Sequence, residues 1–137
     1  MLAAILIYTA FTVFFCYSTM APFFPSELER RGLNRLWNSI VFAVFSFSYV
    51  ICALLAKKLF IPACGRVGAF IIATIALLAS LVIMALLPLI PNDTLFLICG
   101  ILARIIQGGG GCVQVLNVFA ILSLAYKEKM SLLHNFV

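Results

Sequence analysis

The chain has 137 residues, of which 66% are hydrophobic and only 9% are charged. A soluble domain is about half apolar and about one-quarter charged, because water must solvate its surface. Four acidic and nine basic residues are too few to solvate this chain. The composition therefore excludes an ordinary soluble globule and predicts an integral membrane protein whose surface lies in a lipid bilayer.

The placement of the charges and cysteines argues against several other classes of protein. The net charge of +5 comes from bases in short runs between apolar stretches, where membrane proteins place loop charges, and no basic face with exposed aromatics suggests a nucleic-acid partner. The five cysteines and the single His134 lack zinc-site spacing. We expect no metal and no cofactor. No nucleophile–base pair or phosphate loop indicates an enzyme.

The first apolar stretch covers roughly residues 2–24. It starts without a basic leader, contains no clear A-x-A cleavage site and exceeds the apolar core of a typical signal peptide. We therefore expect it to remain in the protein as the first membrane span. The segment PSELERRGLNRL (residues 25–36) follows. Its proline, glycine and charged residues predict that the span ends there.

Three further apolar stretches follow, each with about the 20 residues that a helix needs to cross a bilayer. Trp37 opens the first of them at the expected membrane interface. The stretches do not alternate as barrel strands do. The sequence therefore predicts an all-α membrane protein with four transmembrane helices in residues 1–126. The connections are short enough to make neighbouring helices antiparallel. The predicted helices cover residues 2–24, 37–56, 67–90 and 94–126, with a cytoplasmic tail, which truncation of the chain could explain, at 127–137.

The basic residues favour one orientation. If the second connection and the tail are cytoplasmic, five bases lie inside and three outside, a modest positive-inside bias. We therefore expect both termini in the cytoplasm of a multi-pass protein, in a vesicular, endomembrane or plasma membrane. The inner set is Lys57, Lys58, Arg66, Lys127 and Lys129, and the outer set is Arg30, Arg31 and Arg35.

The fourth span contains unusual polar residues. Arg104 lies about ten residues into it, where burial of a charge costs at least about 3 kcal/mol, so it is a functional candidate. At 100° per residue, Arg104, Gln107, Gly111 and Gln114 fall on one stripe, and Asn117 follows. Gln114 and Asn117 are the candidates for lining a substrate cavity, and the two glutamines can instead simply bond across helices. Four successive glycines, from residue 108 to 111, indicate close helix packing or a kink.

The motif R-I-I-Q-G-G-G-G-C, residues 104–112, resembles the R-x-x-Q-G-x-G-x-A signature in the fourth helix of major-facilitator proton antiporters. Arg104, Gln107, Gly108 and Gly110 match it, and Cys112 stands where alanine is usual. In that family the arginine is implicated in proton coupling. The resemblance therefore implies a proton-coupling role for Arg104.

Two other stretches bear on the same resemblance. A-P-F-F-P-S-E-L-E-R-R-G, residues 21–32, is similar to the end of the first helix in the vesicular amine and polyamine transporter branch. The family's second signature, G-x-x-x-D-R-x-G-R-R, falls on residues 58–67. Gly65 and Arg66 fit it as a remnant of the gating loop. Pro62 replaces the acid that holds the family's gate, so the gating contact does not carry over.

Together these motifs imply that residues 1–126 form part of the N-terminal six-helix half of a major-facilitator fold, which has two such halves with a site between them. The implied function is proton-coupled antiport of a small, cationic or amine-like organic solute. The chain supplies four of those helices, so we expect transport to be incomplete in this fragment. The expected partners are the lipid bilayer, the solute and the proton.

Two rival interpretations remain. A non-transporting subunit or scaffold of a larger complex would use the polar stripe to contact partner membrane helices, and would pair Arg104 with a fixed acid. A dimeric four-helix multidrug exporter depends on a buried acid in its first helix. Residues 1–24 contain no acid, which disfavours that class.

Overall fold

A computed structural model describes residues 2–56, 58 and 61–134. The described chain is helical apart from short turns and contains no strand in these ranges. Each of the four α-helices is long and apolar enough to cross a membrane, which confirms the prediction of an all-α chain with four apolar spans. The elements are α1 (Leu2–Arg30), α2 (Leu36–Leu55), α3 (Ile61–Leu86), the 3₁₀ turn η2 (Leu87–Leu89) and α4 (Asp93–His134).

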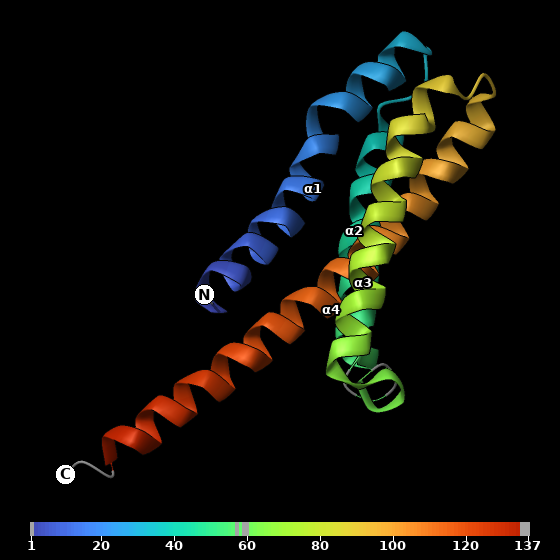
Figure 1. The fold of residues 1–137 in the computed structure, drawn as a ribbon. Helices are drawn as coiled ribbons and strands as arrows, with labels where there is room; N and C mark the ends of the chain where they lie inside the picture. The colour runs from blue at the N-terminus through green and yellow to red at the C-terminus, as the bar shows by residue number, and fades with distance from the viewer. Residues whose placement is uncertain (1, 57, 59–60, 135–137) are drawn as a thin grey trace.

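Successive helices run antiparallel, and α4 lies at the centre of the bundle. The α1–α2 and α3–α4 turns lie together at one end, and the chain termini lie toward the other (Figure 1). Helix α4 packs along both α2 and α3. Helix α1 packs more extensively against α4 than against α2. In the apolar part of each helix, 56% of α4 is buried against 6% of α2. The bundle is therefore organised around α4, and not as two separate hairpins.

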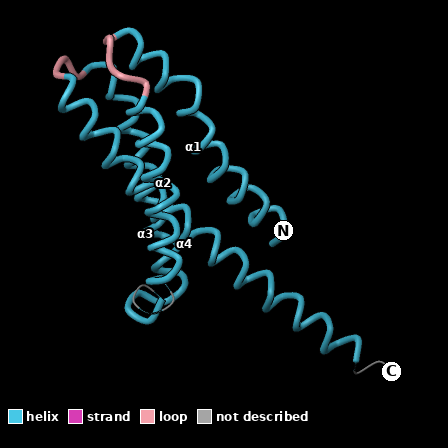
Figure 2. The backbone as a smooth tube through the Cα atoms, turned by 180° about the vertical axis from the view of Figure 1, so that it is seen from behind, coloured by secondary structure: helices cyan, strands magenta, loops and turns pink. Residues whose placement is uncertain are grey.

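The last part of α4 projects away from the other helices, as the view from behind shows (Figure 2). The sequence predicted a tail from residue 127, but α4 continues to His134, and residues 135–137 lie outside the described part. Lysine, glutamate, methionine and leucine after Tyr126 are strong helix formers. Charged residues end a membrane span without ending the helix that carries it.

Helix α1 also extends beyond its predicted end near residue 24, through Pro25, to Arg30. Its end is set by Gly32, whose φ of +66° lies in the left-handed region. The Gly32 amide donates to the Glu29 carbonyl and the Leu33 amide donates to the Leu28 carbonyl, each at 3.0 Å. This pair of bonds is a Schellman motif. Glycine therefore terminates the helix, and proline removes only one internal hydrogen bond.

Helix α3 begins earlier than the predicted residue 67, at Ile61, but it is interrupted at Gly65. The φ of +68° and ψ of 168° at Gly65 are not helical. The uninterrupted apolar span starts at this residue. A residue without Cβ accepts this conformation at little cost, which explains why the helix bends here.

The apolar core is concentrated near the end that holds the α1–α2 and α3–α4 turns. Phe24 of α1 and Phe96 of α4 are fully buried and stack with ring centroids 5.4 Å apart. A Cβ at Gly100 would lie 3.3 Å from the Phe24 ring, so this glycine allows α1 to approach α4 closely. The other buried residues of the cluster are Met20, Leu28, Val41 and Leu87.

An ionic cluster holds the same end together. Arg31 Nε bonds Glu27 at 2.8 Å and its NH1 bonds Asp93 at 3.1 Å. Its NH2 donates to the Ile90 carbonyl at 2.7 Å, and its guanidinium lies 4.5 Å from the Phe96 ring centroid. The hydrogen bond that Arg31 donates to the Glu27 carboxylate raises the pKa of Arg31. This one side chain therefore ties the end of α1 to the α3–α4 turn.

Candidate functional site

Arg104 lies deep inside the bundle, 11 residues after the start of α4 at Asp93. At about 1.5 Å per residue this is about 16 Å, close to the middle of a hydrocarbon layer about 30 Å thick. Its side chain is fully buried. NH1 donates to Gln107 Oε1 at 2.7 Å, and Gln107 Nε2 donates to the Cys16 carbonyl of α1 at 2.8 Å. Gln107 therefore connects the arginine to α1.

Three aromatic rings surround the guanidinium. Its central carbon lies 4.7 Å from the ring centroid of Phe42, 5.3 Å from that of Tyr17 and 5.5 Å from that of Phe45. A cation within about 6 Å of a ring face is attracted to the π electrons, by about 2 kcal/mol when water is excluded. The rings therefore offset part of the cost of burying this charge.

The hydrogen-bonding capacity of Arg104 is only partly used. Nε and NH2 are buried and have no hydrogen-bond partner, and none of the described ion pairs includes Arg104. The acids Glu27, Glu29 and Asp93 pair instead with arginines near the turns. A buried donor without a partner costs about 1–3 kcal/mol, and more when it is charged. Arg104 is thus a buried cation with one free edge.

The glycine run is the place where the other three helices meet α4. A Cβ on Gly108 would lie 2.6 Å from the Phe45 carbonyl oxygen of α2, and one on Gly110 would lie 3.1 Å from the Ala73 oxygen of α3. A Cβ on Gly109 would meet only the Cys52 sulfur, at 3.9 Å, and one on Gly111 the Val13 side chain of α1, at 3.4 Å. Successive glycines point in different directions. The run therefore allows close packing on three sides, the first of the two uses that the sequence indicated.

Hydrogen bonds join α2 to α4 beside this run. Ser48 Oγ donates to the Ile105 carbonyl at 2.8 Å, and Cys52 Sγ donates to the Gly109 carbonyl at 3.4 Å. Both bonds join residues 57 positions apart, so α2 and α4 run in the same direction in register. The contact fixes α2 against the helix that carries Arg104.

Gln114 and Asn117 continue the polar side of α4 but are separate from Arg104. Both are buried. Gln114 Nε2 donates to Thr74 Oγ1 of α3 at 2.7 Å, and Asn117 Nδ2 donates to the Val113 carbonyl of its own helix at 3.0 Å. Gln114 therefore bonds across helices, one of the two roles that the sequence left open. Neither residue lines the two larger grooves described below.

The Gln114–Thr74 contact leads to a prediction. Thr74→Val keeps the side-chain shape but removes the acceptor of Gln114 Nε2, so we expect the free energy of unfolding to fall by about 1 kcal/mol. Unfolding by SDS in mixed micelles measures the change. Thr12→Val is the control, because Thr12 bonds only the Tyr8 carbonyl of its own helix. Equal stability of the two variants would contradict the prediction.

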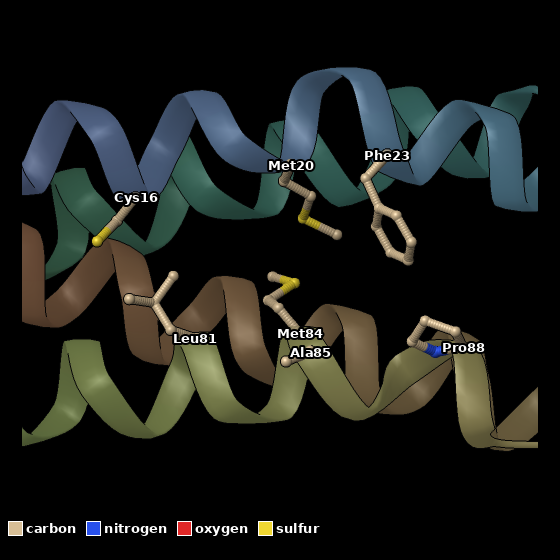
Figure 3. A pocket seen from close by; sticks show the side chains of 7 residues that line it. All are labelled: Cys16, Met20, Phe23, Leu81, Met84, Ala85 and Pro88. Atoms are coloured by element: carbon tan, nitrogen blue, oxygen red, sulfur yellow. The ribbon is translucent and has the colours of Figure 1, made fainter.

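An apolar groove of about 400 Å³ lies between α1 and α3. Figure 3 shows Met20 and Phe23 of α1 pointing across it toward Leu81 and Met84 of α3. Its remaining lining side chains are Cys16, Ala85 and Pro88. None of these side chains is charged, so this groove offers no site for a polar ligand.

A second groove, of about 410 Å³, lies next to Arg104; we call it the α1–α2 groove. Tyr17 and Phe45, whose ring centroids are 4.8 Å apart, line it and also surround the guanidinium. These two rings therefore separate the groove from Arg104. The other lining residues are Val13, Phe14, Ser46, Tyr49, Val50 and Val115.

Gly65 and Arg66, which the resemblance implied to be a gating-loop remnant, are exposed and lie apart from this site. Gly110 contacts Ala73 of α3, two helical turns beyond Gly65. Because α3 and α4 are antiparallel, Arg104 lies farther still from Gly65. The proposed coupling residue and the gating remnant are therefore not neighbours.

Two features of the site were not identified from the sequence. The rings of Tyr17, Phe42 and Phe45 come from two other helices, so their contact with Arg104 depends on helix packing. Glu27 is buried, although its charge suggested an exposed position. Its spacing of three and four residues to Arg30 and Arg31 was a usable signal for pairing on a helix.

Comparisons with protein-family models, curated proteins and solved structures give no match for this chain.

Proposed function

We propose that this helix bundle forms one part of a proton-coupled secondary antiporter of a small organic solute, with Arg104 as the coupling residue. The observation that carries the proposal is the buried guanidinium of Arg104, which has free donors near the middle of the apolar span. Ionisable groups at this depth are characteristic of ion and substrate pathways. The motif at residues 104–112 favours the same role.

The arrangement of α4 favours transport over the scaffold alternative. A scaffold was expected to turn its polar stripe toward another protein and to pair Arg104 with a fixed acid. Here Gln107 and Gln114 bond to α1 and α3 of the same chain, and no described carboxylate forms an ion pair with Arg104. A cation that no permanent partner neutralises can respond to a ligand or to a proton held nearby.

The amine class of solute depends only on the similarity of residues 21–32 to the vesicular amine branch. We also propose that both termini are cytoplasmic. Arg30, Arg31 and Arg35 are all in ion pairs at the end opposite the termini. Lys58 and Arg66 are exposed at the other end. With Lys57, Lys127 and Lys129, the sequence has five bases in the segments assigned to the cytoplasmic side against three on the opposite side, which favours this orientation.

The direct test is solute flux in vesicles that contain the chain. Because the chain supplies only four of the expected helices, the vesicles are prepared from cells that make it together with its native membrane partners. An imposed proton gradient should then drive uptake of a radiolabelled aromatic amine such as tyramine. In Arg104→Gln we expect gradient-driven uptake to fall at least about tenfold, because the charge is lost while the side chain stays polar. Collapse of the gradient by an ionophore should abolish the wild-type signal.

Arg35→Gln is the matched control, because its side chain is 85% exposed and pairs only with exposed Glu29. Its uptake should equal that of the wild type. Gradient-independent uptake, or equal uptake by wild type and Arg104→Gln, would refute the proposal. Equal uptake would show that Arg104 is not the coupling residue, whereas no gradient-driven uptake by the wild type would favour the scaffold role.

A further inference from the structure

The two hydrogen-bond donors of Arg104 that have no partner lie side by side. NH1 is used by Gln107, and the two donors that remain, Nε and NH2, lie on the same edge of the planar guanidinium. Two parallel donors match the two oxygens of a carboxylate, which arginine binds through paired charge-assisted hydrogen bonds. The edge therefore has the geometry of a carboxylate site.

The α1–α2 groove offers a route to that edge. The half-buried rings of Tyr17 and Phe45 line the groove and also lie against the guanidinium, so a ligand in the groove would reach the edge by rotation of these side chains. The groove, about 410 Å³, falls within the size range of small-molecule sites. Its walls are apolar and aromatic, and Tyr17, Ser46 and Tyr49 are the hydroxyl-bearing residues among them. A ligand with an acidic head and a short apolar body fits these surroundings.

We propose that the α1–α2 groove binds a small amphiphilic organic carboxylate, whose carboxylate group pairs with Nε and NH2 of Arg104. The ligand satisfies both free donors and neutralises the buried cation, and its apolar part displaces lipid or water from the groove. A guanidinium repels an ammonium group at this position. An amine solute would therefore bind elsewhere in the protein.

The test is equilibrium binding of radiolabelled hexanoate to the purified chain in nanodiscs of zwitterionic lipid, with binding to empty nanodiscs subtracted. We expect saturable binding of one hexanoate per chain. Unlabelled hexanoate should compete, whereas hexanamide and hexylammonium, which have the same body without the negative charge, should not. Equal competition by all three compounds, or an absence of saturable binding, would overturn the proposal.

Variants test the role of the guanidinium. Arg104→Gln should weaken hexanoate binding at least about tenfold, and Arg104→Lys should weaken it less, because an ammonium keeps the charge but loses the paired geometry. Arg35→Gln should bind like the wild type. Unchanged affinity in Arg104→Gln would refute the assignment. If that variant does not fold, the competition series on the wild type still decides.

This inference does not depend on transport. Binding is measured without a proton gradient, so hexanoate binding can hold while amine uptake fails, and the reverse can also occur. The two proposals are therefore tested separately.

Discussion

Replacing Gly108 with alanine is expected to lower the free energy of unfolding of the bundle by about 2 kcal/mol. The new Cβ would lie 2.6 Å from the Phe45 carbonyl oxygen and 3.1 Å from the Ser48 Cβ. The nearest atom belongs to the backbone of α2, so no side-chain rotation relieves the overlap and the two helices must separate. Separation also weakens the Ser48 hydrogen bond to Ile105. Unfolding by SDS, followed by the fluorescence of the single Trp37, measures the loss.

The adjacent glycine supplies the matched control. Gly109→Ala adds the same methyl group to the same helix, but the nearest atom, Cys52 Sγ, is 3.9 Å away. Alanine is the better helix former by about 1 kcal/mol, so this variant should equal or exceed the wild type in stability. Gly110→Ala should be intermediate, since its Cβ would lie 3.1 Å from the Ala73 oxygen. If Gly108→Ala and Gly109→Ala have the same stability, the close α2–α4 contact is wrong.

Arg31→Ala should produce the second large loss of stability. The change removes the bonds from Arg31 to Glu27, Asp93 and the Ile90 carbonyl, and also the guanidinium above the Phe96 ring. Glu27, whose side chain is only 8% exposed, keeps a single partner, Arg30. The loss of a partner by a buried carboxylate lowers the free energy of unfolding more than the loss of an exposed ion pair does. We expect a lower midpoint of SDS unfolding and a larger separation of α1 from α4.

Arg35→Ala is the control for this experiment. Its bond to Glu29 is shorter, 2.6 Å, but both side chains are largely exposed, and such surface pairs contribute about 0–1 kcal/mol. Arg31→Ala should therefore be the clearly less stable variant. The reverse order would show that burial does not determine the strength of these ion pairs. Distance measurements between spin labels at exposed Phe11 and exposed Phe119 can follow the separation of α1 from α4.

The Gly108 contact and the Arg31 contacts each hold in place a helix whose aromatic side chains surround Arg104. The Gly108 contact holds α2, which carries Phe42 and Phe45, against the helix of Arg104. The Arg31 contacts tie the end of α1, the helix that carries Tyr17, to the α3–α4 turn. Both are needed to enclose the guanidinium within three rings. Variants that loosen either contact should therefore increase access to Arg104, and hexanoate binding can report that change.

The sequence by itself determined the class of this protein and the number of its apolar helices. Composition decides this, because so few charges cannot solvate the surface, and a stretch of about 20 apolar residues in lipid must satisfy its own backbone hydrogen bonds as a helix. The sequence also identified α4 as the unusual helix, since Arg104 and the glycine run depart from the apolar pattern. Helix ends were less predictable. Pro25 did not end α1, because a Schellman turn at Gly32 sets its end instead.

Only the tertiary structure decided how α4 uses its polar residues. Periodicity placed Arg104, Gln107 and Gln114 on one stripe, yet Gln107 bonds to α1 and Gln114 bonds to α3. The partners of a side chain depend on which helices pack against it and at what distance, and residues 57 or 91 positions apart in the chain leave no local pattern. The free edge of Arg104 is likewise a property of the packed bundle. The described acids Glu27, Glu29 and Asp93 pair with other arginines near the turns, and none of them forms an ion pair with Arg104.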